Sequence, residues 1–153
     1  YDNYLILALI IMDESNDYEY FCHKYKVSNN IKDRFKNIAL NFNDIKNKKF
    51  YLNSNIRKLI YLSGKNSTLD LLLFSTCANN KRKNFDVEEL IAYVQNCKVP
   101  KFPISGEYLK EHGYKTGEVL GKKLKELEEE WIKNNFSIDE KKFKKSLDKG
   151  DHN

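Results

Sequence analysis

The chain has 153 residues, 41% of them hydrophobic, which is long enough for a domain with a buried core. Its 27 basic and 22 acidic residues give a net charge of +5, which permits an anionic partner and is explained equally well by the codon bias of an AT-rich genome. The longest apolar run, from Leu5 to Met12, is too short to span a bilayer, so no membrane partner is expected.

Two further features bound the class of protein. Cys22, Cys77 and Cys97 are widely separated and form no C-x-x-C pair, which predicts buried, reduced thiols in a cytoplasmic protein. The chain starts at Tyr1 without Met and enters an apolar helix pattern almost at once. We therefore expect a fragment of a longer protein that lacks an N-terminal part.

Helical periodicity dominates the first 98 residues. Apolar side chains recur at intervals of three and four in six segments, which cover residues 4–12, 18–26, 31–45, 54–63, 67–77 and 87–94. The segment from Ser67 is expected to be the most deeply buried, along a stripe of Leu69, Leu72, Leu73, Thr76 and Cys77. These segments predict a compact helical body over residues 1–98.

Helix ends in this body carry recognisable capping signals. Gly64 occupies the position of a left-handed C-terminal cap after the fourth segment. Asp86, followed three residues later by Glu89, has the spacing of a capping box and predicts the start of the sixth helix. Lys81 to Lys83, in the loop before it, is either a solvated basic cluster or a phosphate contact.

The stretch from Val99 to Gly121 concentrates the residues with special backbone properties. It holds both prolines and four of the six glycines, which are Gly106, Gly113, Gly117 and Gly121. Such a concentration predicts a fixed backbone conformation, and thus a joint between the helical body and residues 99–153.

The C-terminal segment is predicted to form two helices. The longer covers residues 116–135, with the apolar stripe Leu120, Leu124, Leu127 and Trp131, and its ion pairs are expected to be Glu118 with Lys122 and Glu129 with Lys133. A second capping box, Ser137 with Glu140, is expected to open the last helix, in which Phe143 and Leu147 point inward. The sequence therefore predicts an all-α protein, with a body of short helices, a Pro/Gly-rich joint and a tail of one long and one short helix.

Gly117 and Gly121 support two interpretations. Both lie beside the apolar stripe of the long helix, so their missing side chains could permit close packing against another helix. Alternatively, bare amides at the start of this helix, next to lysines, could bind a phosphate. Close packing is the simpler interpretation, and the two are compatible.

The sequence carries no catalytic constellation. It contains no phosphate-binding glycine motif and no H-E-x-x-H, and no paired carboxylates are placed for a two-metal site. We therefore expect no catalytic residue, no metal site and no cofactor within these residues.

The Pro/Gly-rich stretch and the helix after it resemble the C-terminal signature of tRNA nucleotidyltransferases, the CCA-adding enzymes, and of the related bacterial poly(A) polymerases. The residues that carry this resemblance are VPKFPISG from Val99 to Gly106, then Leu109, Gly113, Gly117, Val119, Leu120, Gly121, Leu124, Leu127 and Trp131. Upstream, Arg57, Lys58, Tyr61, Gly64 and the Asp70 to Leu73 run are similar to the helical body of the same family.

The resemblance implies a division of labour along a longer protein. A catalytic head and a neck, which bind Mg²⁺ and read CTP or ATP, would precede these residues, and the body and tail would hold the acceptor arm and elbow of tRNA. One position departs from the family pattern Ser-Gly-x-Asp-Leu, because Tyr108 stands where the acid is usual and Glu107 lies one residue earlier.

We therefore expect a tRNA-holding module that contacts RNA through its backbone phosphates. The expected contact residues are Lys115, Gly117, Lys122, Lys123, Arg82, Lys83, Lys101 and Lys110. Residues expected to define the structural motif are Pro103, Gly106, Gly113, Gly121 and Trp131. Alternatives that remain open are a helical protein-interaction module without RNA binding and the C-terminal part of a poly(A) polymerase.

Overall fold

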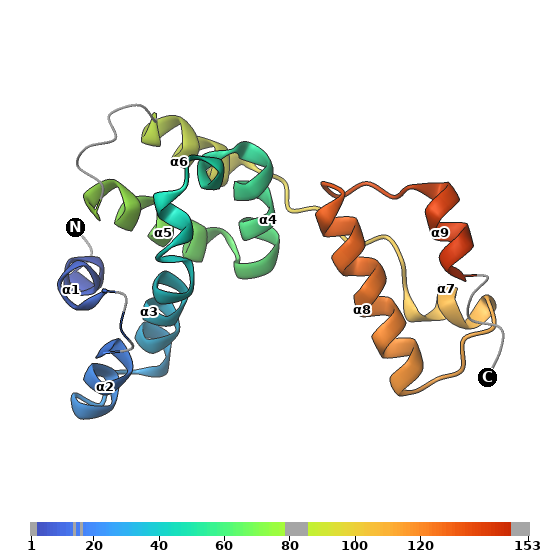
Figure 1. The fold of residues 1–153 in the computed structure, drawn as a ribbon, viewed down its shortest axis with the longest axis horizontal. Helices are drawn as coiled ribbons and strands as arrows, with labels where there is room; N and C mark the ends of the chain where they lie inside the picture. The colour runs from blue at the N-terminus through green and yellow to red at the C-terminus, as the bar shows by residue number, and fades with distance from the viewer. Residues whose placement is uncertain (1–2, 14, 16, 79–85, 148–153) are drawn as a thin grey trace. The chain divides into compact units, whose positions relative to one another are not determined.

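The computed structural model describes residues 3–13, 15, 17–78 and 86–147. These residues form α-helices and two short 3-10 helices without any strand, so the predicted all-α class is confirmed (Figure 1). The chain separates into two compact units, Tyr1–Val99 and Pro100–Asn153. The boundary expected from the sequence lies one residue earlier, after Lys98.

The first unit is arranged around one central helix, α5. In order, its helices are α1 (Asn3–Ile11), α2 (Asp17–Lys24), α3 (Asn29–Asn41), η1 (Asp44–Lys46), η2 (Lys48–Tyr51), α4 (Asn53–Ser63), α5 (Lys65–Ala78) and α6 (Val87–Asn96). Helix α5 packs against α1, α3, α4 and α6, which lie around it in Figure 1. Its contacts therefore join segments from both ends of the unit.

The buried face of α5 differs from the predicted stripe. Thr68, Leu71, Leu72 and Ser75 are buried at the helical spacing, whereas Leu73 is 41% exposed and Cys77 is exposed. The Thr68 hydroxyl donates to the carbonyl of Gly64, directly before α5, and the Ser75 hydroxyl donates to the Leu72 carbonyl, at 2.8 Å in each case. Because these bonds remove the cost of burying a hydroxyl, a stripe chosen by hydrophobicity alone missed this face.

Cysteine burial was also predicted incorrectly in part. Cys22 is buried on α2, Cys97 is partly exposed, and Cys77 is exposed. The error at Cys77 has the same origin as the misassigned face of α5.

The predicted helix over residues 31–45 is interrupted. Helix α3 ends at Asn41, and Ile45 is buried from the 3-10 helix η1 instead. In η2, Phe50 and Tyr51 are also buried, and the Tyr51 hydroxyl donates to the Ile45 carbonyl at 2.7 Å. Two short turns thus replace the last turn of the predicted helix and add aromatic rings to the core.

The capping predictions in this unit are confirmed at one helix and modified at another. The Asp86 carboxylate accepts a hydrogen bond from the Glu89 amide at 3.2 Å and caps α6. Gly64 has φ +85° and ψ 165°, so its φ is positive but its conformation is extended rather than left-handed helical. Helix α5 starts at the next residue, which makes Gly64 the whole connection between α4 and α5.

The second unit contains α7 (Gly106–Glu111), α8 (Glu118–Lys133) and α9 (Glu140–Leu147). Its core consists of Leu109, Tyr114 and Leu127, against which apolar residues from the extended segment before α7, from α8 and from α9 pack. Helix α7 was not predicted from the sequence; it is short and begins where the Ser105 hydroxyl accepts from the Tyr108 amide at 3.2 Å. Its Leu109 side chain is completely buried in the core of the unit.

The end of α8 forms a Schellman motif. The Phe136 amide donates to the Trp131 carbonyl at 2.8 Å, and Asn135, with φ +54°, takes the left-handed position. The Trp131 and Phe136 rings meet edge to face with centroids 4.9 Å apart, which supplies the hydrophobic contact that accompanies this motif.

The predicted cap of the last helix is wrong. The Ser137 hydroxyl donates back to the Asn134 carbonyl at 2.6 Å, and the Asp139 carboxylate accepts from the Lys141 amide at 3.1 Å. Asp139 therefore caps α9 in place of Ser137. No helix in the described residues is long and apolar enough to cross a membrane.

Candidate RNA-binding surface

Two glycines of the Pro/Gly-rich stretch lie at the two ends of α7. Gly113 has φ +91° and follows α7, where its amide donates to the Lys110 carbonyl at 3.0 Å as part of a second Schellman motif. A Cβ atom added at Gly106 would meet the Leu120 side chain of α8 at 3.4 Å, an ordinary van der Waals contact. Gly113 therefore has a conformational role, whereas the packing of α7 on α8 does not require glycine at position 106.

Close helix packing at Gly117 and Gly121, the simpler interpretation of the sequence, is wrong. In the described residues, a Cβ atom at either position would meet no atom within 4 Å apart from its chain neighbours and, at Gly121, the backbone of its own helix. Gly117 instead serves as the N-cap of α8, with φ +125° and ψ −154°, a conformation that is essentially restricted to glycine. Gly121 lies exposed one turn later. The open start of α8 leaves phosphate binding there as a hypothesis.

The expected lysines on α8 are already engaged. The Lys122 ammonium lies 2.7 Å from the Glu118 carboxylate, which confirms that predicted ion pair, and both side chains are exposed. The Lys123 side chain is only 14% exposed and lies 3.4 Å from the Glu126 carboxylate. These pairs neutralise part of the positive charge that the sequence placed at this helix start.

The other predicted residues fall into three groups. Lys101, Lys110 and Lys115 are exposed, as is Pro103 in the extended segment before α7. Trp131 is buried, and its ring lies 5.3 Å from that of Phe102. Arg82 and Lys83 lie outside the described residues.

In the described part of α8, the second expected pair, Glu129 with Lys133, forms no ion pair.

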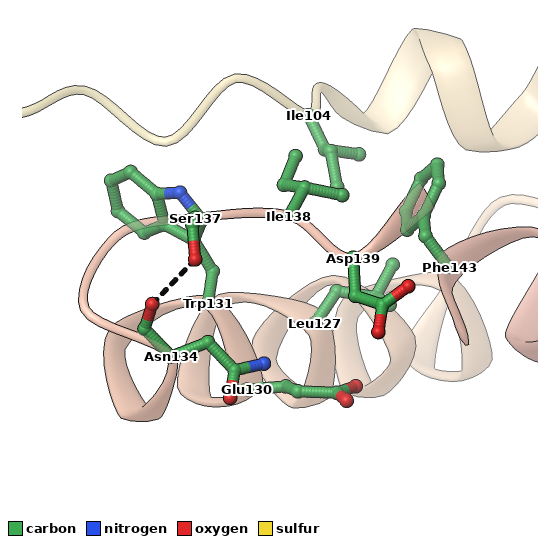
Figure 2. Close-up of a pocket in the computed structure, with 9 residues that line it drawn as sticks. All are labelled: Ile104, Leu127, Glu130, Trp131, Asn134, Ser137, Ile138, Asp139 and Phe143. Carbon is green, nitrogen blue, oxygen red and sulfur yellow. Dashed lines mark hydrogen bonds between the residues drawn. The ribbon is translucent and has the colours of Figure 1, made fainter. Parts of the chain in front are cut away.

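One pocket of the second unit is too small for a nucleotide. It lies between the C-terminal half of α8 and the segment that leads to α9, with Ile104 and Ile138 over its centre (Figure 2). Its volume is about 20 Å³, which is room for about one water molecule. This pocket is therefore a gap in the packing of the unit.

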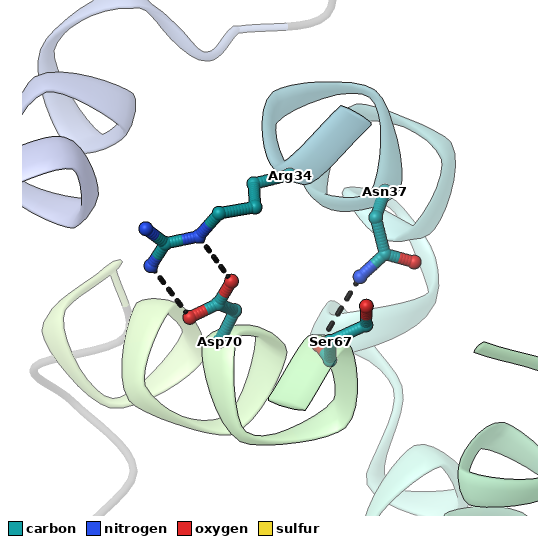
Figure 3. A network of polar contacts seen from close by, with 4 residues as sticks. All are labelled: Arg34, Asn37, Ser67 and Asp70. Carbon is teal, nitrogen blue, oxygen red and sulfur yellow. Dashed lines mark hydrogen bonds and ion pairs between the residues drawn. The ribbon is translucent and has the colours of Figure 1, made fainter. Parts of the chain in front are cut away.

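In the first unit, a polar network joins α3 to α5. The Arg34 guanidinium binds the Asp70 carboxylate through two bonds, of 2.7 Å and 2.9 Å, and Asn37 donates to the Ser67 carbonyl at 3.1 Å (Figure 3). The Arg34 and Asp70 side chains are 24% and 13% exposed. Arg34 is thus committed to Asp70 and is a poor candidate for an RNA contact.

The described residues show no sign of an acid-base or metal centre. They contain no group of three His, Cys, Asp or Glu residues that could hold a metal ion. The pKa values of Tyr18, Cys22 and Tyr93 are raised, in each case mainly by burial. A hydrogen bond from the Ser15 hydroxyl lowers the pKa of Asp13, which lies on the surface. These shifts have local causes and do not converge on one site.

The departure at Tyr108 has a physical explanation. Ser105 is the N-cap of α7, so position 108 is the third helical residue, where the acid of a capping box would bond back to the N-cap amide. In this chain the Tyr108 ring instead lies 4.3 Å from the His112 ring and 6.0 Å from the Phe143 ring. Position 108 therefore contributes ring packing between α7 and α9, and not the side-chain acceptor of a capping box.

The positive charge is concentrated in the first unit. Residues 1–99 contain 15 basic and 11 acidic residues, whereas residues 100–153 contain 12 and 11. Within residues 35–69 there are seven basic residues and one acidic residue, Asp44. This imbalance is visible in the sequence, but none of the predicted RNA contacts lies within residues 35–69.

A hollow lies within this basic segment, between α3, the two 3-10 helices and α4. We call it the basic hollow, and its polar lining consists of Asn41, Asp44, Asn47, Lys49, Asn55 and Lys58. Its volume is about 320 Å³, and apolar side chains complete its wall. Neither Lys49 nor Lys58 has a side-chain partner in the described part of the chain.

The model of the family described as tRNA nucleotidyltransferase domain 2 matches residues 2–144. The chain belongs to this family. The match spans both units, and thus includes the Pro/Gly-rich stretch and the helices upstream of it. No curated protein and no solved structure matched the chain.

Proposed function

We propose that this chain is the tRNA-holding C-terminal part of a tRNA nucleotidyltransferase that adds or repairs the 3′-terminal CCA of tRNA with CTP and ATP. The observation that carries the proposal is the family match over residues 2–144. In this proposal catalysis, Mg²⁺ and nucleotide binding belong to a head and neck outside these residues. The partners of the chain are then tRNA and that catalytic head.

The physical properties of the two units support a holding role. Recognition of folded RNA by shape requires a rigid surface that offers cations and hydrogen-bond donors to phosphates and 2′-hydroxyls. Both units are built of helices packed on buried cores, and lysines dominate their positive charge, with 24 lysines against three arginines. The exposed lysines of the second unit, Lys101, Lys110 and Lys115, remain proposed contacts.

A titration with tRNA tests the proposal. We expect the chain to bind full-length tRNA, with log K falling by about 0.7–0.9 per contacted phosphate for each unit of log salt concentration. A double-stranded DNA of similar charge and length serves as the control, because it lacks the 2′-hydroxyls and the L-shape of tRNA. Binding that is absent at low salt, or equal for tRNA and DNA, would contradict the proposal.

One observation favours a second candidate, a protein-interaction module. Helix α1 exposes two isoleucines at a spacing of one turn, Ile6 at 46% and Ile10 at 76%, next to the partly exposed Tyr4. An apolar helix face of this kind is typical of protein contacts. If the apolar face alone accounts for function, the chain will bind a protein partner with an affinity that does not depend on salt concentration. Ile10→Asp will then abolish binding to that protein, and the chain will show no affinity for tRNA.

The comparisons leave the choice between CCA addition, A-addition and poly(A) synthesis within the proposal. That choice depends on the nucleotide-reading residues, which we assign to the head and neck. Incubation of the full-length enzyme with tRNA and labelled CTP or ATP separates CCA addition, which incorporates both nucleotides, from A-addition and poly(A) synthesis, which incorporate AMP alone.

A further inference from the structure

The basic hollow of the first unit combines free cations with a fixed backbone. Lys49 and Lys58 line it from η2 and α4 and have no side-chain partner in the described residues. The acidic residue nearest to them in the lining is Asp44. By contrast, Lys122 and Lys123 of the second unit are paired with glutamates. Free ammonium groups lose no existing ion pair when they bind a phosphate, so the hollow is the better cation site.

Hydrogen bonds hold the backbone of the hollow on both sides of Lys49. The Asn47 side chain accepts from the Lys49 amide at 3.0 Å, and the Asn55 amide group donates to the Lys49 carbonyl at 2.5 Å. Asn55 and Lys58 lie three residues apart on α4 and thus on one helix face. The Lys49 backbone is therefore fixed in position relative to Lys58 before any ligand arrives, which lowers the cost of ordering on binding.

The chemistry of the lining selects among anionic ligands. Asparagine amides offer donors and acceptors to 2′-hydroxyls, and lysines offer point charges to phosphates. The aromatic ring in the lining, Phe50, is buried and presents no face on which an unpaired base could stack. This combination suits the sugar-phosphate backbone of a folded RNA better than a single strand.

We propose that the basic hollow is the main RNA-backbone contact of this chain, with Lys49 and Lys58 on adjacent phosphates and the asparagines on ribose hydroxyls. This inference rests on the proposed tRNA-holding function and names the surface that performs it. Asp44 limits the affinity of the hollow, because its carboxylate repels the phosphates.

A charge-matched pair of variants tests the assignment in the full chain. Lys49→Gln/Lys58→Gln removes two charges from the hollow, and Lys125→Gln/Lys133→Gln removes two exposed charges from α8 in the second unit. At about 0.1 M salt, the hollow variant is expected to bind tRNA with roughly 25- to 60-fold lower affinity. Its plot of log K against log salt concentration should be less steep by about 1.4–1.8. The control variant should change little in either quantity. Circular dichroism of both variants excludes unfolding as the cause.

A gain-of-affinity variant makes the test independent of damage to the fold. Asp44→Asn removes the carboxylate and is expected to raise tRNA affinity by about 2- to 5-fold. The assignment is overturned if both lysine variants lose equally, or if Asp44→Asn leaves the affinity unchanged, in a chain that does bind tRNA. If the unaltered chain binds no tRNA, the proposed function itself fails, and this inference fails with it.

Discussion

Gly117 and Gly121 are four residues apart, and alanine substitutions at the two positions should change the free energy of unfolding in opposite directions. Gly117 holds φ +125° and ψ −154°, so Gly117→Ala forces an L side chain into a conformation that costs about 1–3 kcal/mol. Gly121 lies inside α8 with open space at its missing Cβ atom. Gly121→Ala should therefore stabilise the second unit by about 0.5–1 kcal/mol, through reduced backbone entropy of the unfolded chain.

The measurement uses the single tryptophan of the chain. Trp131 is buried in the second unit, so its fluorescence in a urea titration follows the unfolding of that unit. The two variants should differ by about 1.5–4 kcal/mol in the free energy of unfolding, since the cost at one glycine adds to the gain at the other. If Gly121→Ala destabilises the unit as Gly117→Ala does, another surface packs on Gly121, and the open helix start described above is incorrect.

The remaining predictions test the packing of the first unit and the start of α7. Arg34→Met leaves the largely buried Asp70 carboxylate without its two bonds and should cost about 1.5–3 kcal/mol by urea unfolding followed by circular dichroism, a loss that the double variant Arg34→Met/Asp70→Leu should largely recover. Iodoacetamide should modify Cys77 first at pH 8 and Cys22 last, because Cys22 is buried and burial raises the pKa of its thiol; equal rates, measured by peptide mass spectrometry, would contradict the burial. Tyr108→Asp should lose ring packing but complete a capping box, and so be less destabilising than Tyr108→Ala by about 0.5–1 kcal/mol in the Trp131 assay; equal losses would exclude the box.

Helix positions were predictable where one face is apolar and the opposite face is charged. Phe35 and Ile38 on α3, and Ile56 and Ile60 on α4, are buried at the spacing that the sequence shows. The predictions failed where burial does not follow hydrophobicity. Helix α5 is surrounded by four others, so its sequence shows little contrast between faces, and hydroxyls that bond to their own helix can be buried among apolar residues.

Backbone features were predictable in kind but not in role. The sequence indicated that the Pro/Gly-rich stretch fixes a conformation, and Gly113 and Gly117 have positive φ values. Composition could not show which glycine ends a helix, which starts one and which lies against another helix, because these features depend on neighbours distant in sequence. Gly106 illustrates this, since its close neighbour Leu120 belongs to the next helix.

The candidate site was the least predictable part because charge in a sequence does not show which charges are free. At the start of α8, lysines and glutamates alternate at helical spacing, so the helix geometry that brings Lys122 toward a ligand also brings Glu118 within 2.7 Å. In the described residues Lys49 and Lys58 have no such partner, and the neighbouring Asn47 and Asn55 side chains bond to the Lys49 backbone instead. A segment rich in both lysine and asparagine therefore keeps its positive charge available, whereas an equally lysine-rich segment with interspersed glutamates largely neutralises it. If the basic hollow binds RNA as proposed, the local ratio of basic to acidic residues is the sequence feature that indicates it, and the number of lysines is not.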